Sequence, residues 1–233
     1  MKLGIMQPYF FPYIGYFQLI NAVDAFVVFD DVNFIKKGWI NRNNLLVNNQ
    51  AYLFTLPIKG MSQNRKINET ELSIETNWKG GLLETIKQNY KKAPQFHEVY
   101  PIIESSILSK INNIAQYNFV QIQTICEYLN IFTRFIPSSS VYNNSQLKGQ
   151  ERIIDICIKE KATCYLNPIG GTALYNKEAF DNHNIGLYFL KPIAFEYKQM
   201  NNSFLPYLSI LDTLMFVDRD KIKNELFPKF ELI

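Results

Sequence analysis

Residues 2–29, KLGIMQPYFFPYIGYFQLINAVDAFVVF, decide the fold that this chain predicts. Lys2–Met6 is a short apolar run that ends at a Gln-Pro pair, which is typical of a buried strand entering a turn. Gly15–Ala22 has helical spacing, and Ala25–Phe29 is a β-branched and aromatic run that indicates a second buried strand. Strand, short loop, helix and strand within about 30 residues form a βαβ unit, whose crossover predicts parallel strands.

The rest of the chain continues this pattern around a block of helices. Further strands are predicted at Ala51–Ile58, Glu69–Ile74, Ile131–Pro137, Thr163–Leu166 and Gly186–Lys191. Helices are predicted at Trp78–Tyr90, Val99–Leu129, Gly149–Lys161 and Leu205–Phe216. The sequence shows no clean domain boundary, so we expect one α/β domain over residues 1–233. It should be Rossmann-like, with a mostly parallel sheet and a mainly helical insertion or appendage at about residues 78–130.

Composition narrows the function classes. A hydrophobic fraction of 47% excludes a disordered chain, and a net charge of +3 without a clustered basic face gives no reason to expect nucleic acid. The cysteines Cys126, Cys157 and Cys164 have no CxxC spacing, which argues against a disulfide framework and a cysteine zinc site. The sequence has no apolar stretch of about 20 residues and no clear signal peptide, so we expect a cytoplasmic protein without a membrane span.

Polar segments follow the first two predicted strands, where open parallel sheets bind ligands. In the first segment, two prolines rigidify the loop and Gly15 allows a close backbone approach. Gln7, Tyr9 and Tyr16 add more polar tips than a structural turn needs. The alternative is an aromatic loop with a purely structural role.

The second segment begins with two adjacent carboxylates, Asp30 and Asp31. Successive residues of an extended chain point to opposite faces, so only one of them can face a site directly. Basic, aromatic and amide side chains follow that could bind a phosphate or stack on a base or sugar: Lys36, Trp39, Arg42 and Asn43. Lys36 and Arg42 should lower the pKa of the inward-facing carboxylate. A capping carboxylate beside a solvated basic loop is the alternative.

Two later segments could complete a pocket. Asn167, Gly170 and Gly171 follow a predicted strand, and the glycines could present backbone N–H groups to an anion, although a plain turn has the same signature. Gln199 and Asp212 add polar groups to an apolar frame, where Asp212 is equally consistent with a cap or a buried ion pair. No metal site is assigned, and GxSxG, HExxH, EF-hand and Walker motifs do not occur.

The opening MQPYFFPYIGYFQLINAVDAFVVFDDVNFIKKGWINRN, residues 6–43, resembles the WbqC-like family of bacterial surface-polysaccharide loci. The later SILDTLM and YLNPIGGTALY also resemble that family, so the similarity runs over nearly the whole chain. The resemblance implies a role in building lipopolysaccharide O-antigen or similar glycans, by modifying an amino sugar while it is nucleotide-linked.

A fainter similarity concerns Phe11–Tyr16, which resembles the HxGH loop of nucleotidylyltransferases. In those enzymes the loop histidines stabilise the reacting phosphates at a helix N-terminus. Tyr13 and Tyr16 stand at the two histidine places. Tyrosine can donate a hydrogen bond but cannot supply the positive charge of an imidazolium.

These patterns predict an enzyme that forms an amide on the amino group of a nucleotide-linked sugar by acyl or aminoacyl transfer. The reaction needs a base, an oxyanion donor and a sugar-diphosphate pocket. Asp30 or Asp31 is the candidate base, Lys36 and Arg42 would hold the diphosphate, and the oxyanion donor would be Tyr9, Tyr16 or Gln7. The alternatives are a nucleotidylyltransferase-like enzyme and a non-catalytic partner in a glycan-assembly complex. The expected ligand is a small-molecule nucleotide-sugar. The sequence identifies neither a cofactor nor the sugar, and it leaves a homodimer open.

Overall fold

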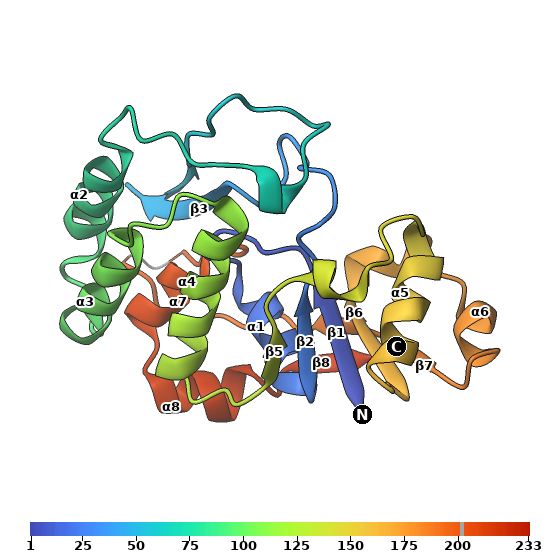
Figure 1. Ribbon diagram of the computed structural model, residues 1–233. Coiled ribbons are helices and arrows are strands. Elements are labelled where there is room, and N and C mark those ends of the chain that lie inside the picture. Colours follow the sequence, from blue (N-terminus) through green and yellow to red (C-terminus); the bar gives the residue numbers. More distant parts are fainter. Residues whose placement is uncertain (201–202) are drawn as a thin grey trace.

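The predicted βαβ unit forms the centre of a six-stranded sheet in the computed structural model, which describes residues 1–200 and 203–233 (Figure 1). β1 (Lys2–Met6) pairs in parallel with β2 (Ala25–Val28), and α1 (Ile14–Ala22) connects them. The strand order is β5-β2-β1-β6-β7-β8. The other strands are β5 (Arg134–Ile136), β6 (Cys164–Pro168), β7 (Gly186–Pro192) and β8 (Phe230–Leu232). The expected Rossmann-like α/β fold with a mostly parallel sheet is confirmed.

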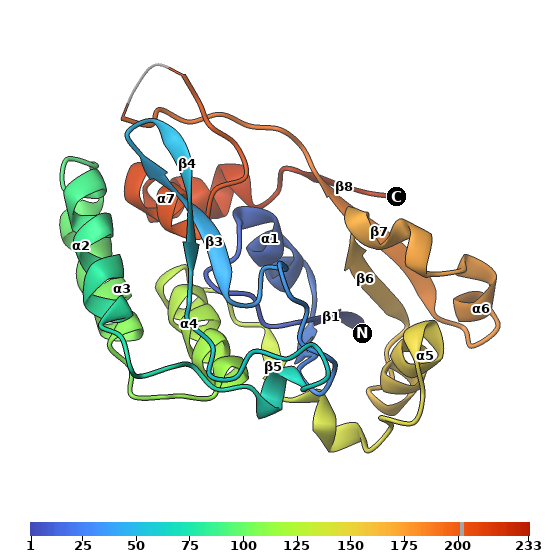
Figure 2. The same cartoon turned by 90° about the horizontal axis from the view of Figure 1, so that it is seen from above.

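The strand order reverses between β1 and β6. The chain moves outward from β1 through β2 to β5 and then returns to the other side of β1 as β6. β8 closes the opposite edge antiparallel to β7. Figure 2 views the sheet from above its carboxyl ends, where loops after neighbouring strands diverge at the reversal. Ligand sites of open α/β sheets lie at such a point.

Helices cover both faces of the sheet. α1 packs on one face, while α5 (Gly149–Lys159) and α6 (Lys177–Asp181) lie on the other. Alternate residues of β1 serve the two sides, and Leu3 and Ile5 pack with Ile153 and Ile156 of α5. None of the helices within the described residues is long and apolar enough to cross a membrane.

A helical block and a hairpin extend the α1 side of the molecule. The hairpin is β3 (Arg42–Val47) and β4 (Gln50–Thr55), and the block is α2 (Trp78–Tyr90), α3 (Phe96–Ile107) and α4 (Ile114–Tyr128). The chain returns to this side as α7 (Ile210–Phe216), followed by α8 (Arg219–Lys221) and a π-helical turn at Ile222–Leu226. Short 3-10 turns lie at Ile67–Glu69, Ser139–Tyr142 and Ile169–Leu174.

Two expected elements differ in the structure. The long helix expected at Val99–Leu129 is wrong, because the chain breaks after α3 and restarts at Asn113, whose side chain caps α4 by accepting from the Gln116 N–H. The strand expected at Glu69–Ile74 is also wrong. Its alternation instead belongs to a turn followed by isolated bridges, in which Leu72 is buried against the core.

Other boundaries shift by a few residues. The strand expected at Ala51–Ile58 ends earlier, as β4, and the helix expected at Leu205–Phe216 begins only at Ile210, where Ser209 caps it. β3 was not expected, because its sequence RNNLLV lacks the β-branched and aromatic residues that signal a strand.

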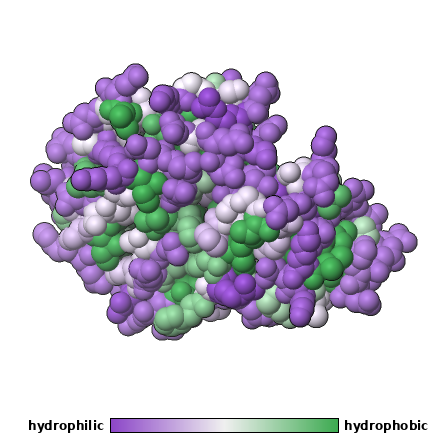
Figure 3. All heavy atoms as spheres, in the orientation of Figure 1, coloured by the Kyte–Doolittle hydropathy of each residue, from purple (hydrophilic) through white to green (hydrophobic). Residues whose placement is uncertain are grey.

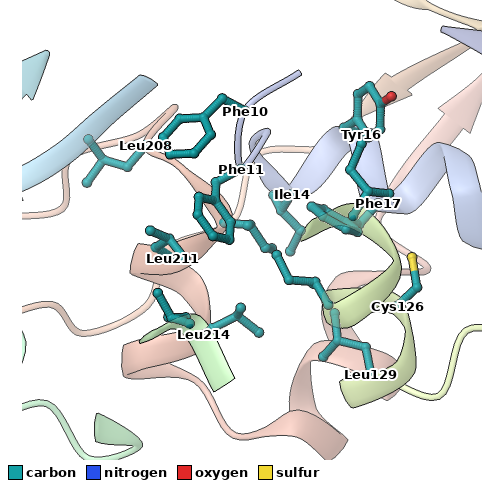
Figure 4. Packing of buried hydrophobic residues seen from close by; sticks show 14 of the residues in the cluster. Phe10, Phe11, Ile14, Tyr16, Phe17, Cys126, Leu129, Leu208, Leu211 and Leu214 are labelled. Atoms are coloured by element: carbon teal, nitrogen blue, oxygen red, sulfur yellow. The ribbon is translucent and has the colours of Figure 1, made fainter. Parts of the chain in front are cut away.

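The loop between β1 and α1 lies in the core. Phe10 and Phe11 are buried among leucines of α7 and residues of α1 and α4 (Figure 4). Amide and hydroxyl side chains hold the loop's carbonyl oxygens. Asn43 Nδ2 donates to the carbonyls of Phe10 at 3.0 Å and Phe11 at 2.7 Å. Asn118 Nδ2 donates to the Pro8 carbonyl at 2.9 Å, and Ser209 Oγ to that of Phe11 at 2.8 Å.

Replacing Asn43 by Ala should destabilise the fold, because the buried Phe10 carbonyl loses its side-chain donor. We expect the free energy of unfolding to fall by about 1–3 kcal/mol in a urea titration. Gln50→Ala, an exposed change on the same hairpin, is the control and should stay within about 0.5 kcal/mol of the parent. Equal losses in the two variants would contradict a specific role for the Asn43 amide.

Candidate functional site

A cleft of about 750 Å³ opens at the carboxyl edge of the sheet. One wall is the loop after β2, including Phe29 and Asp31, and the opposite wall is the segment that leads into α5. Figure 3 shows the molecular outline indented between these two parts. Tyr175, which follows β6 along the chain, closes a third side. The cleft therefore lies near the strand-order reversal, where the fold predicts a ligand.

Positive side chains from separate segments face the cleft. Lys66 comes from the turn before α2, Lys148 is the N-cap residue of α5, and Arg152 lies in the first turns of α5. No side chain of the described residues caps the first turn of α5. Its backbone N–H groups and the helix dipole therefore add to the positive potential on this side of the cleft, against the charge of Glu151 in the same turn. The arrangement favours an anionic ligand.

A buried ion pair joins the two walls of the cleft. Arg152 Nη2 donates to both carboxylate oxygens of Asp31, at 2.6 and 2.5 Å, and both side chains are almost fully buried. Arg152 Nε donates to Asn144 Oδ1 at 2.9 Å, and the guanidinium carbon lies 4.9 Å from the centre of the Phe29 ring. These contacts fix the guanidinium from several directions, which a solvated arginine would not require.

Asp30 lies beside this pair and faces the loop after β5. Its Oδ1 accepts from Ser138 Oγ at 2.7 Å and from the Ser139 N–H at 3.1 Å. Ser139 Oγ also hydrogen-bonds Asp31, so one hydroxyl lies between the two carboxylates. Burial raises the pKa of Asp30, against the opposing effect of the hydrogen bonds from Ser138 and Ser139, and the charge of Asp31 adds to the rise.

This finding corrects the expected electrostatics of the Asp pair. The pKa of Asp30 is raised rather than lowered, and the cation beside Asp31 is Arg152. Arg42 instead turns back onto its own loop, where Nε donates to the Gly38 carbonyl at 3.0 Å. Its guanidinium carbon lies 5.8 Å from the Trp39 ring centre, and Lys36 is exposed on the same loop. Trp39 and Arg42 are therefore in contact, and neither they nor Lys36 line the cleft.

In the loop after β1, the polar side chains of Tyr9 and Tyr16 pack within the loop. Tyr16 is buried and its hydroxyl donates to the Gln7 carbonyl at 2.9 Å, so it already has a partner within the loop. Tyr9 is half-buried with its ring 5.7 Å from that of Tyr16. Gly15 is needed for the close approach of Tyr13, whose ring occupies the space that a Cβ would take. Asn43 holds this loop, as described above.

The segment after β6 reaches the cleft through Tyr175. Asn167 is buried and donates to the Tyr165 hydroxyl at 2.6 Å, while a Cβ at Gly171 would overlap the Asn167 side chain. The absence of a side chain at Gly171 therefore allows the close approach of Asn167, whereas Gly170 is exposed. Neither glycine is among the residues that line the cleft.

Gln199 and Asp212 lie in a separate polar network. Asp212 is fully buried and accepts from the Tyr197 hydroxyl at 2.6 Å, Gln199 Nε2 at 2.7 Å and the Tyr90 hydroxyl at 3.1 Å. Burial raises the pKa of Asp212, opposed by these hydrogen bonds. The network joins α7 to α2 and to the segment after β7, so it is distinct from the cleft.

Sequence reasoning missed the cations of the cleft and the serines below Asp30. Arg152 had a usable signal, because it shares the buried face of α5 with Ile156, four residues later, where a charged residue needs a partner. Ser138 and Ser139 follow the strand predicted at Ile131–Pro137, so the carboxyl-end rule applies to them too. Lys66 and Lys148 carry no local signal that separates them from surface lysines.

The fold and the cleft define a Rossmann-like α/β protein with a cationic cleft at the carboxyl edge of its sheet. The model of the WbqC-like protein family matches residues 7–224, and the chain belongs to that family. A Mycobacterium tuberculosis (strain ATCC 25618 / H37Rv) protein, "Uncharacterized protein Rv1507c", is 30% identical over 219 residues. The match covers 93% of this chain and 94% of the relative. No solved structure matches the chain. The expected family membership is confirmed.

The two aspartates should respond oppositely to substitution by Asn. Asp31→Asn leaves Arg152 buried with its charge uncompensated, so the free energy of unfolding should fall by about 3–5 kcal/mol. In Asp30→Asn the side-chain oxygen can still accept from Ser138 and Ser139, and the cost of burying a charge disappears. We therefore expect Asp30→Asn to be at least as stable as the parent protein at pH 7, measured by urea unfolding.

The pH dependence follows from the raised pKa of Asp30. The native state holds this proton more tightly than the unfolded state, so ionisation costs stability above the folded pKa. That cost vanishes as the pH falls below the unfolded pKa of about 4. The advantage of Asp30→Asn should therefore be largest at neutral pH and shrink on acidification. An advantage that grows towards low pH would overturn this account.

Proposed function

We propose that this protein binds a nucleotide-linked amino sugar in the carboxyl-edge cleft and forms an amide on its amino group, as a step in surface-glycan synthesis. The observation that carries the proposal is the cleft itself, which brings Lys66, Lys148 and Arg152 together beside the first turn of α5. The glycan context rests on the resemblance to the WbqC-like family. Amide formation rests on the carboxylates beside the cleft.

The charge balance of the cleft suits a diphosphate. Asp31 offsets the charge of Arg152, whereas Lys66 and Lys148 form no ion pair with any of the described residues. Two uncompensated positive charges and a helix N-terminus match the negative charge of a nucleoside diphosphate. A volume of about 750 Å³ also lies within the range of ligand pockets.

The proposed reaction is nucleophilic acyl transfer. The amino nitrogen of the sugar attacks the carbonyl carbon of an activated acyl or aminoacyl donor, such as a thioester or an ester. The new C–N bond forms as the donor's C–S or C–O bond breaks, and the carrier leaves as a thiol or an alcohol. The proton of the amine passes to a base and from there to the leaving sulfur or oxygen; the base is needed because only the neutral amine is nucleophilic.

Asp30 is our candidate for this base. It is not itself among the residues that line the cleft, but it is adjacent to Asp31, which is. Its raised pKa moves it towards the range in which a carboxylate accepts a proton effectively at neutral pH. The hydrogen bonds from Ser138 and Ser139 go to Oδ1, which leaves Oδ2 to accept a proton. Asp31, held by Arg152, is better suited to position that guanidinium than to act as a base.

Nucleotidylyl transfer has less support from the geometry. The hydroxyl of Tyr16 is buried on the Gln7 carbonyl, and Tyr13 lines a different pocket from the cationic cleft. The two tyrosines at the histidine places of an HxGH loop therefore do not converge on the phosphate-binding side chains. This arrangement favours amide formation over the alternative expected from the fainter resemblance.

Removing the cleft lysines should weaken nucleotide-sugar binding. We expect Lys148→Ala and Lys66→Ala each to raise the dissociation constant of a UDP- or dTDP-linked amino sugar about tenfold, because each removes a charged hydrogen bond to phosphate. Isothermal titration calorimetry would measure this. Lys36→Ala separates the cleft from the exposed loop, and Lys223→Ala, on a distant exposed turn, is the matched control. Loss with Lys36→Ala alone would move the diphosphate to the other loop.

Turnover should depend on Asp30 without a matching change in stability. With a nucleotide-linked amino sugar and a panel of acyl thioesters and aminoacyl esters, we expect Asp30→Asn to lower product formation by about 10²–10⁴-fold. Mass spectrometry of the acylated sugar gives the rate, and urea unfolding checks the fold. Full activity of Asp30→Asn on a verified substrate would remove Asp30 from the proposed chemistry.

A further inference from the structure

A second pocket, of about 310 Å³, lies between the start of α1 and the segment that follows β7. Figure 2 shows this segment passing near the tip of the β3–β4 hairpin before the chain returns to α7. Its walls are largely aromatic and come from three parts of the chain: Tyr13, Phe195, Tyr197, Phe204 and Tyr207. The pocket shares no lining residue with the cationic cleft.

The aromatic rings pack against one another as a preformed wall. The ring of Tyr197 meets that of Phe204 edge to face, with centroids 5.0 Å apart, and stacks on that of Phe195 at 6.3 Å. Tyr197 is fixed from behind, because its hydroxyl donates to the buried Asp212 at 2.6 Å. A rigid wall of rings loses little conformational freedom when a ligand binds.

The electrostatic character of this pocket is opposite to that of the cleft. Glu196 is the charged side chain among its lining residues, which include no lysine or arginine. Asp212 lies directly behind Tyr197, and its carboxyl oxygens accept hydrogen bonds from the hydroxyls of Tyr197 and Tyr90 and from Gln199 Nε2. The faces of aromatic rings are also negative. The hydroxyl of Thr213 adds an acceptor to the lining.

Tyr207 supplies a backbone observation that points the same way. It adopts a left-handed conformation with φ of 59°, which is unfavourable for a residue with a Cβ, and its side chain is 81% exposed. The residues after it are fixed, since Leu208 is buried and Ser209 caps α7. The structure thus holds a large aromatic side chain in solvent at the pocket, where burial does not account for it.

We propose that this pocket binds a small organic ammonium compound. The ammonium group would lie against the aromatic rings and Glu196, and the apolar part of the ligand would pack against the surrounding side chains. The rings attract a cation through their faces, and Glu196 excludes anions of similar size. A primary ammonium could also donate to the hydroxyls of the lining, whereas a quaternary ammonium uses the ring faces alone. This site is independent of the proposed amide formation.

Matched pairs of ligands test the charge requirement. Cyclohexylammonium is compared with cyclohexanol for a primary ammonium, and choline with 3,3-dimethyl-1-butanol for a quaternary one, by ligand-observed NMR titration of the full chain. We expect the cation of at least one pair to bind about tenfold more tightly than its neutral partner. Equal binding within both pairs, or no binding by either cation, overturns the proposal.

Variants then place the binding in this pocket. Glu196→Gln and Tyr207→Leu should each weaken the preferred cation by about threefold or more, because one removes the charge and the other a ring. Both residues are exposed, so the fold should persist, and Glu225→Gln and Tyr52→Leu are exposed controls elsewhere. Cation binding unchanged in both pocket variants assigns it to another surface and overturns the proposal. Nucleotide-sugar affinity, measured on the same variants, reports separately on the cleft.

Discussion

The buried carbonyl oxygens of the loop after β1 are the constraint on which the rest of the structure depends. Prolines and aromatic side chains carry this loop into the core, where its carbonyls cannot reach water and must find donors within the protein. The donors come from three distant elements, Asn43 of β3, Asn118 of α4 and Ser209 before α7. The hairpin, the helical block and the C-terminal helix are therefore all tied to the carboxyl end of the central strand.

Local sequence patterns predicted correctly those elements whose structure depends mainly on residues close together in the sequence. The βαβ unit, α2 and α5 follow from periodicity and flanking turn residues, because each buries one face in the way its spacing requires. The strand predicted at residues 69–74 is wrong because long-range contacts decide the structure of this segment. Its backbone bonds go to a distant loop, as when the Leu72 N–H donates to the Asn112 carbonyl, so an alternating pattern does not become a strand.

The sequence predicted where the candidate site lies better than it predicted which side chains meet there. The carboxyl-end rule found Asp30 and Asp31, because it depends only on where a strand ends. It could not find the partner of Asp31, since Arg152 is 121 residues away and the cations that the sequence suggested, Lys36 and Arg42, do not line the cleft. A charge on a predicted buried face was the one local sign of that long-range pair.

The Asp31–Arg152 pair links the fold to the chemistry of the cleft. It joins the loop after β2 to the first turns of α5, and so it sets the separation of the two walls that carry the ligand groups. It also places one ionised carboxylate beside Asp30, with Ser139 between them. Two buried carboxylates in such contact resist ionising together, and Arg152 offsets only the one that it binds. The difference in environment assigns different roles to adjacent residues of the same type: Asp31 holds a cation in place, and Asp30 retains an affinity for a proton.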